Sequence, residues 1–192
     1  MHSRFSRFPM HDARNERGSA LVEFAVTLPL LVVFLVGIYD FSGAFTQKQK
    51  IEQAAQEGAI VAGAQPMNDI YINPQNPNPD SLQPVVTAIF NSLVGANVLP
   101  QGNQSPCVPT GTVTLNGGVS WTYTISGCPD NLIITINRGW TGSGTPAGVG
   151  TQVTVRYPYR WRFNSAIQLI MPGAQYAATT NLTETATVHN QT

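Results

Sequence analysis

The chain has 192 residues, and its ten basic side chains balance ten acidic ones, so the formal net charge is zero. This length accommodates one domain of ordinary size and an additional segment. A neutral chain lacks the basic surface that holds nucleic acid, so no nucleic-acid partner is expected. Arginines crowd the first eighteen residues, whereas the C-terminal two-thirds is rich in Thr, Asn, Gln, Gly and Pro. The latter composition is common in exported β-rich domains.

An apolar segment follows the basic N-terminus. Between residues 20 and 45 the charged residues are Glu23 and Asp40. As a helix this segment is about 39 Å long, which is enough to cross a bilayer with some tilt. Four arginines precede the segment and two lysines follow it. The positive-inside rule therefore favours a cytoplasmic N-terminus, one membrane-spanning helix and an exported C-terminal part.

Three kinds of N-terminus combine basic residues with an apolar run. A secretory signal is cut beyond the run, and Ser42 to Ala44 offers a small-x-small site for that cleavage. An uncleaved anchor needs no particular residue. A prepilin-type leader is cut before the run, on the cytoplasmic side, after a small residue such as Gly18. In that case the apolar helix stays in the mature protein.

Glu23 distinguishes the three alternatives, because it lies five residues after Gly18 at the start of the apolar run. Burying a carboxylate in hydrocarbon costs about 3 kcal/mol, and neither a signal nor an anchor gains from it. Cleavage after Gly18 would give Ser19 a free amino terminus. Glu23 of a neighbouring subunit could neutralise that positive charge inside a helix bundle. The prepilin interpretation is therefore favoured.

A family pattern extends along this helix. It comprises Arg17, Gly18, the Glu23-Phe24 pair, Pro29, Gly37 before Asp40, and Gln53, Ala54, Ala55 and Ala59. In these positions the chain resembles the TadE-like pseudopilins, minor pilins of the tight-adherence (Tad) pilus system, which is type IV-like. Major pilins of that system typically carry Glu-Tyr and are very short, so Phe24 and the long exported part favour a minor pseudopilin. The TadF and TadG groups share this kind of N-terminus.

The resemblance implies a location, partners and a function. The protein would be a single-pass protein of the bacterial inner membrane, with a cytoplasmic N-terminus and a periplasmic or extracellular C-terminal domain. A prepilin peptidase would cut after Gly18, and other pilins and pseudopilins of the Tad machinery would be its partners in pilus assembly and cell adhesion. The alternative is an exported binding or adhesion module without a pilus role, which uses residues 20 to 45 as an anchor or signal.

The helix is expected to continue beyond the membrane as a stalk. Lys48 and Glu52 have the spacing of an i,i+4 ion pair. One narrow helix face repeats small or apolar residues, namely Ile51, Ala54, Ala55, Gly58, Ala59 and Ala62. Small residues allow close approach, either to the sheet of the same chain, which is favoured, or to neighbouring helices. Prolines from Pro66 onward end the helix near Gly63, and Pro29 within the apolar run is expected to break it locally.

Four regions follow from these boundaries: a leader (1–18), a transmembrane helix and stalk (19–63), a Pro/Asn-rich linker or surface loop (64–80), and an exported α+β domain (81–192). A second helix is predicted to begin at Asp80, with Gln83 completing a capping box, and to end at Gly95. Its apolar side consists of Val85, Val86, Ile89, Phe90, Leu93 and Val94.

From Gly111 onward the apolar period changes to two, which predicts strands. Four segments dense in β-branched and aromatic residues predict an antiparallel meander: 112–115, 119–126, 131–138 and 151–163. Pro158 predicts an edge or a bend in the last of these. A short helix is predicted over 164–171 and a final strand over 177–188. The fold class is therefore α+β, with a long helix carrying a sheet-rich, pilin-like head.

Cys107 and Cys128 are the two cysteines, and each lies beside a proline in a loop-like setting. In an exported domain they would form a disulfide that closes a loop of about twenty residues and stabilises the fold by about 3 kcal/mol. Two separate buried thiols are the alternative, and the disulfide is favoured. Two cysteines and the nearby His189 do not supply four ligands, so no metal site is expected.

No catalytic constellation is present in the sequence. His2 and His11 lie in the predicted leader, His189 lies next to the C-terminus, and Asp130 lies in a turn. Phosphate-binding loops and nucleophile elbows are absent from the sequence. The protein is therefore not expected to be an enzyme, to bind a small-molecule substrate or to need a cofactor.

Aromatic residues are frequent in the predicted sheet: Trp121, Tyr123, Trp140, Tyr157, Tyr159, Trp161 and Phe163. They indicate either an adhesive surface for sugars or a substratum, or ordinary packing of the sheet, which is favoured. Arg156, Arg160 and Arg162 alternate along one strand face. They fit a contact with an acidic partner and equally a solvated strand face.

Overall fold

The first element, α1 (Ala13–Ala64), is one long helix that ends just before the proline-rich stretch. The computed structural model describes residues 13–100, 107–142, 148–163, 173 and 179–191. The predicted helix end near Gly63 is confirmed, because Pro66 cannot continue a helix and restricts the residue before it. Pro29 lies inside α1 and does not end it.

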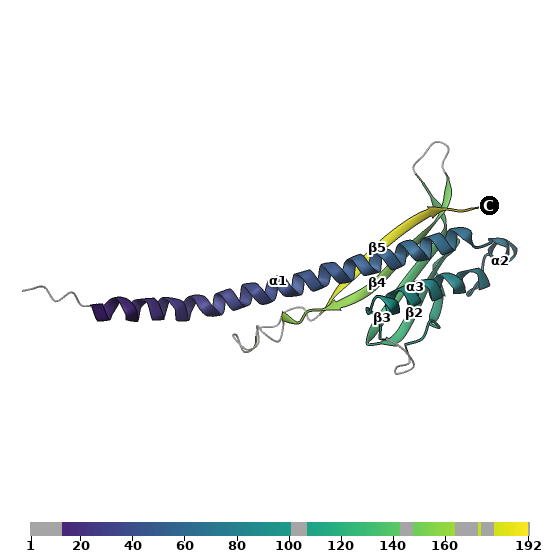
Figure 1. Ribbon diagram of the computed structural model, residues 1–192. Coiled ribbons are helices and arrows are strands. Elements are labelled where there is room, and N and C mark those ends of the chain that lie inside the picture. Colours follow the sequence, from purple (N-terminus) through teal and green to yellow (C-terminus); the bar gives the residue numbers. More distant parts are fainter. Residues whose placement is uncertain (1–12, 101–106, 143–147, 164–172, 174–178, 192) are drawn as a thin grey trace, which may run out of the picture.

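The N-terminal half of α1 projects away from the rest of the molecule, and its C-terminal half lies along the sheet (Figure 1). In the projecting half Leu21, Phe24 and Ile38 are 62–70% exposed. The most apolar part of α1 has a mean hydropathy of 2.5 and is long enough to cross a membrane. By length and composition the helix fits a membrane span, and a signal sequence near an N-terminus has the same properties.

The C-terminal part forms one antiparallel sheet whose strands follow chain order. The strands are β1 (Thr112–Leu115), β2 (Ser120–Cys128), β3 (Asp130–Thr141), β4 (Val149–Arg160) and β5 (Thr179–His189). The predicted α+β class and meander are therefore confirmed, and β5 corresponds to the predicted final strand. The helix predicted over 164–171 lies outside the described residues.

The Pro/Asn-rich segment between α1 and the second helix contains a five-residue helix, α2 (Asn68–Ile72), that its prolines did not predict. The rest of the segment is attached to β2. The Trp121 indole N–H donates to the Asn76 carbonyl at 2.9 Å, and the Tyr123 hydroxyl donates to Asn78 Oδ1 at 3.0 Å. Two buried aromatic side chains thereby satisfy their polar atoms and hold this segment against the sheet.

The second helix starts differently from the prediction. A 3₁₀ turn, η1 (Asp80–Leu82), leads into α3 (Gln83–Gly95), and neither element has a side-chain hydrogen bond at its N-cap. The predicted capping box is therefore wrong, because the 3₁₀ turn places Asp80 one turn too early to cap α3. The Gln83 side chain instead donates to the Pro109 carbonyl at 3.1 Å. The predicted end at Gly95 is confirmed.

The core lies between the sheet and the two helices α1 and α3. The small-residue face of α1 is fully buried there, with Ile51, Ala54, Ala55 and Ala62 all 0% exposed. The apolar side of α3 meets it with Val85, Val86, Ile89, Phe90 and Leu93. The stalk face therefore packs within its own chain, as favoured from the sequence, since small residues let the helix axis approach the sheet closely.

Lys48 forms an ion pair between α1 and the last strand, β5. Its ammonium lies 3.3 Å from Glu184 Oε1 on β5, so the predicted pairing with Glu52 is replaced by a contact across the fold. The Lys48 side chain is half exposed. An exposed pair of this kind contributes less than about 1 kcal/mol.

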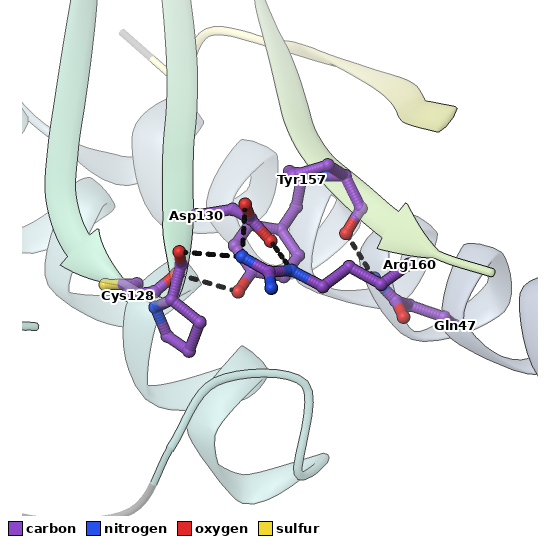
Figure 2. Close-up of polar contacts among 7 residues, drawn as sticks. Gln47, Cys128, Asp130, Tyr157 and Arg160 are labelled. Carbon is purple, nitrogen blue, oxygen red and sulfur yellow. Dashed lines mark hydrogen bonds and ion pairs between the residues drawn. The ribbon is translucent and has the colours of Figure 1, made fainter. Parts of the chain in front are cut away.

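Pro158 lies in β4, which is an interior strand between β3 and β5. The part of β4 up to Arg156 pairs with β3, and Pro158 lies beyond it. Pro158 pairs with Asn181 of β5. Its carbonyl accepts a hydrogen bond from the Gln47 amide of α1 at 3.3 Å (Figure 2). The predicted edge is therefore found at Pro158 itself, although β4 as a whole is an interior strand. A residue without a backbone N–H fits there because β4 extends beyond its pairing with β3 at this point.

The expected disulfide is confirmed. Cys107 and Cys128 are bonded across a sequence separation of 21 residues, and both are buried. Loop entropy makes such a bond worth about 3 kcal/mol.

Polar contacts tie the turn between β2 and β3 to β4 beside the disulfide (Figure 2). Arg160 pairs with Asp130 through Nε–Oδ2 at 2.7 Å and a terminal nitrogen to Oδ1 at 2.8 Å. This two-pronged hydrogen bond holds the pKa of Asp130 below its usual value. The Tyr157 hydroxyl donates to the Cys128 carbonyl at 2.8 Å. Arg160 therefore has its acidic partner within the chain.

Gly58→Leu should destabilise the head, because even a Cβ at this position would lie 2.4 Å from Cγ1 and 2.5 Å from Cδ1 of the buried Ile89. Overpacking of this kind costs about 3 kcal/mol. The measurement is thermal unfolding of the detergent-solubilised chain by circular dichroism. Glu57→Leu adds the same side chain at the exposed neighbouring position and should leave the midpoint nearly unchanged.

Adding Ile89→Ala to Gly58→Leu should recover part of the lost stability. The smaller alanine leaves room for the leucine side chain at the interface between α1 and α3. An unfolding midpoint for Gly58→Leu equal to that of Glu57→Leu would contradict the proposed close approach.

Candidate functional site

The predicted processing site lies on the exposed half of α1. Gly18 and Ser19 are exposed, and a Cβ added to Gly18 would meet no atom within 4 Å. Its φ angle is not in the left-handed region that favours glycine. Neither packing nor backbone conformation in the described structure therefore requires glycine at this position. A requirement for a small residue would have to come from another molecule.

Glu23 lies one helical turn after Ser19 on the same exposed face, and both line a shallow depression with Val22, Val26 and Thr27. The Thr27 hydroxyl donates to the Glu23 carbonyl at 2.9 Å, so this polar group is satisfied within the helix. Among the residues whose side chains are described, no cation or donor reaches the Glu23 carboxylate. Phe24, the other predicted assembly residue, is 62% exposed.

Asp40, the second carboxylate of the apolar run, is buried where α1 leaves the sheet. The Tyr159 hydroxyl donates to Asp40 Oδ1 at 2.8 Å and also lies 3.1 Å from the Asp40 carbonyl. The Phe163 backbone N–H donates to Asp40 Oδ2 at 2.7 Å. Both carboxylate oxygens therefore have donors from the end of β4 and the residues after it, which holds α1 to the sheet at this point.

The same junction brings aromatic rings and a glycine into close contact. Trp161 packs edge-on against Phe41 and Tyr159, with ring centroids 5.2 and 5.1 Å apart. A Cβ at Gly43 would lie 2.6 Å from the Tyr159 hydroxyl oxygen, so a glycine is needed here for the close approach. Burial and the hydrogen bond to Asp40 raise the pKa of Tyr159 to about 12, which keeps its hydroxyl protonated as a donor.

A buried arginine holds the other end of the packed half of α1. Arg138 of β3 is 0% exposed, and its guanidinium donates to the carbonyls of Ala62 and, at 2.7 Å, Gln65. Ala62 lies in the last turn of α1 and Gln65 directly follows the helix, where acceptors are left unsatisfied and the helix carries partial negative charge. Burial lowers the pKa of Arg138, but an arginine stays charged at neutral pH.

The roles of Asp40 and Arg138 were not predicted from the sequence, although signals for both existed. Arg138 has the same strand parity as Leu132, Ile134 and Ile136, which point into the core. A charged residue in such an alternation predicts a buried group with a specific partner. Asp40 is a lone carboxylate at the end of an apolar run, and its partner Tyr159 shares its strand face with Val153, Val155 and Tyr157.

Four of the seven aromatic residues singled out from the sequence are buried and follow the packing interpretation. Trp121, Tyr123, Tyr157 and Tyr159 are at most 8% exposed. Arg156 and Arg162 are exposed, which fits both a solvated strand face and a contact with an acidic partner. Among the described residues, no three His, Cys, Asp or Glu side chains are grouped to hold a metal ion.

The fold and these contacts define a protein in which one long helix, apolar and exposed through its N-terminal half, carries an α+β head on its C-terminal half. Residues 18–59, which make up most of that helix, match the family model described as TadE-like protein. The TadE-like family is not known to be enzymatic. Neither a curated protein nor a solved structure matches the chain.

Tyr159→Phe should weaken the attachment of α1, because it removes a hydrogen bond to a buried carboxylate worth about 1.5–3 kcal/mol. Tyr159 has a higher pKa in the folded chain than in the unfolded one. Its contribution is therefore complete below pH 10 and is lost as the pH rises toward 12. The measurement is an ultraviolet titration of tyrosine ionisation together with unfolding by denaturant.

Burial also raises the pKa of Tyr123, to about 12, and the pKa of Tyr157, so Tyr159→Phe should remove one of the late tyrosine ionisations seen in the unmodified protein. Tyr71 is 76% exposed, and Tyr71→Phe is the matched control that should leave all the late ionisations in place. The same number of late ionisations in Tyr159→Phe as in the unmodified protein would refute the assignment.

Proposed function

We propose that the protein is a minor pseudopilin that takes part in assembling a Tad-type pilus, after a prepilin peptidase has cut the chain behind Gly18. The observation that carries this proposal is the TadE-like match, which covers residues 18–59. The match begins at the residue proposed to end the leader and covers most of α1. Gly18 is not required by packing in the described structure, which favours a role in recognition by a peptidase.

The exposed apolar half of α1 needs an environment other than water. Residues 20 to 39 would form a helix of about 30 Å, which equals the hydrocarbon thickness of a bilayer. Asp40 follows this segment directly and is already buried against the head, so it does not face lipid unpaired. The helix is therefore suited to the bacterial inner membrane before assembly, with the head on the exported side.

Assembly would replace lipid around this helix with the helices of neighbouring subunits. In that setting the amino terminus of Ser19 and the carboxylate of Glu23 are opposite charges close together on an exposed helix face. Pairing between subunits offsets the cost of removing both charges from water, whereas an unpaired charge there costs about 3–5 kcal/mol. Glu23 thereby sets the register of one subunit against the next.

The head contributes a rigid exported unit. Its disulfide suits an oxidising compartment, and the buried attachment of α1 makes the stalk and sheet one body. An anchored or secreted binding module without a pilus role is the competing proposal. The two differ in the position of the mature N-terminus, which a cleavage experiment measures directly.

Gly18→Leu should block processing and leave the chain at precursor size on a gel, because a bulky residue does not fit a peptidase that requires a small one. Gly37→Leu is the matched control: it lies in the same helix, and its Cβ also meets open space. N-terminal sequencing of the unmodified protein should read Ser19 first. A start at Phe45 would indicate a secretory signal and an intact Met1 an anchor, and either would contradict the proposal.

Glu23→Ala should be inserted and processed normally but should reduce pilus number by about tenfold or more, because the partner amine would be left unpaired. The measurement is counting pili by electron microscopy in cells with equal protein levels. Glu57→Ala removes an exposed carboxylate from the stalk and should have no effect. Normal pilus numbers in Glu23→Ala would refute the registration role.

A further inference from the structure

A polar recess of about 340 Å³ lies beside α1, just beyond its apolar segment. Tyr39, Ser42, Thr46 and Lys50 line it from one face of α1, since they recur at intervals of three or four residues. Arg162, which follows β4, lines it from the sheet side. The recess thus combines two cations with the hydroxyl groups of Tyr39, Ser42, Thr46 and Tyr159. The Thr46 hydroxyl donates to the Ser42 carbonyl and the Tyr159 hydroxyl to Asp40, which leaves those of Tyr39 and Ser42 as donors for a ligand.

The two cations have no acidic partner among the described residues. Other charges nearby are already engaged, since Arg160 pairs with Asp130 and Lys48 pairs with Glu184. Arg162 is exposed and Lys50 is half-buried. Two unpaired cations beside the hydroxyl groups of Tyr39 and Ser42 are the chemistry that binds a phosphate group.

An apolar groove of about 720 Å³ adjoins this recess on the side toward the N-terminus of α1. Val33, Phe34, Ile38 and Phe45 line it from α1, and Trp161 lines it from the end of the sheet. Ser42 borders both the groove and the recess. Along the helix axis, therefore, an apolar surface is followed by a cationic one.

The recess begins at the headgroup layer of a bilayer and extends outward from it. If the hydrocarbon ends near Tyr39, Lys50 lies about 16 Å further along the helix. Helical side chains tilt toward the N-terminus, so the Lys50 ammonium is brought back toward the membrane. Tyr39 and Trp161 are the kinds of residue that gather at the membrane–water interface.

We propose that the recess binds the phosphate headgroup of an anionic phospholipid in the leaflet next to the head, with an acyl chain in the apolar groove. Arg162 and Lys50 contact the phosphate, and the Ser42 hydroxyl donates a hydrogen bond to it. This inference rests on the membrane-spanning part of the proposed function and is independent of cleavage at Gly18. The lipid would set the depth and tilt at which α1 presents the head above the membrane.

The test uses the full chain in mild detergent, incubated with phosphatidylglycerol or phosphatidylcholine and examined by native mass spectrometry. Phosphatidylglycerol should be retained about tenfold more than phosphatidylcholine, a difference of about 1.4 kcal/mol. The double variant Lys50→Gln/Arg162→Gln should lose this preference. Lys48→Gln/Arg156→Gln removes the same charge from outside the recess and should keep it.

Equal retention of the two lipids, or equal loss of preference in both double variants, would overturn the proposal. Displacement of phosphatidylglycerol by inorganic phosphate at the same concentration would also overturn it, because the acyl chain would then contribute nothing. N-terminal sequencing of the same sample separates this inference from pilin processing. A chain that starts at Met1 and still retains phosphatidylglycerol contradicts the processing step alone.

Discussion

Helix α1 is held to the sheet by one buried charged side chain at each end of its packed half, and the rest of the architecture depends on this attachment. Asp40 accepts donors from Tyr159 and the backbone of Phe163, while Arg138 donates to carbonyls at the C-terminal end of the helix. Between them the small-residue face of α1 packs on the sheet and α3. A buried charge that loses its partners is costly, so any other position of α1 would be less stable. The contacts of Asp40 and Arg138 therefore specify one position of the helix along the sheet.

This attachment divides α1 into two parts with different environments. From Asp40 toward the N-terminus the helix projects away from the sheet, and most of its large apolar side chains are exposed (Figure 1). Beyond Asp40 toward the C-terminus the same helix forms part of a core. A single continuous helix thus transmits the orientation of the head to the segment that carries Gly18 and Glu23, which the proposed pseudopilin function requires.

Several local features were predictable because they depend on short-range chemistry. Prolines end α1, alternation predicts the strands, and two cysteines beside prolines predict the disulfide. The start of α3 was not predictable in the same way, because a capping-box pattern at Asp80 competes with a 3₁₀ turn. Likewise Lys48 has a helical partner at the right spacing, yet Glu184 on β5 lies closer once the sheet is assembled. Contacts between distant segments override such local preferences.

The sequence by itself determined the apolar helix, the α+β order of elements and the TadE-like pattern that includes Gly18 and Glu23, because each depends on residue type and spacing along one segment. Only the tertiary structure decided that Asp40 faces Tyr159, that Arg138 closes the end of α1, and that Lys50 and Arg162 face one recess. Each of these contacts joins residues separated by about seventy positions or more. Their proximity follows from the register of β3 and β4 against the helix, which no local pattern encodes.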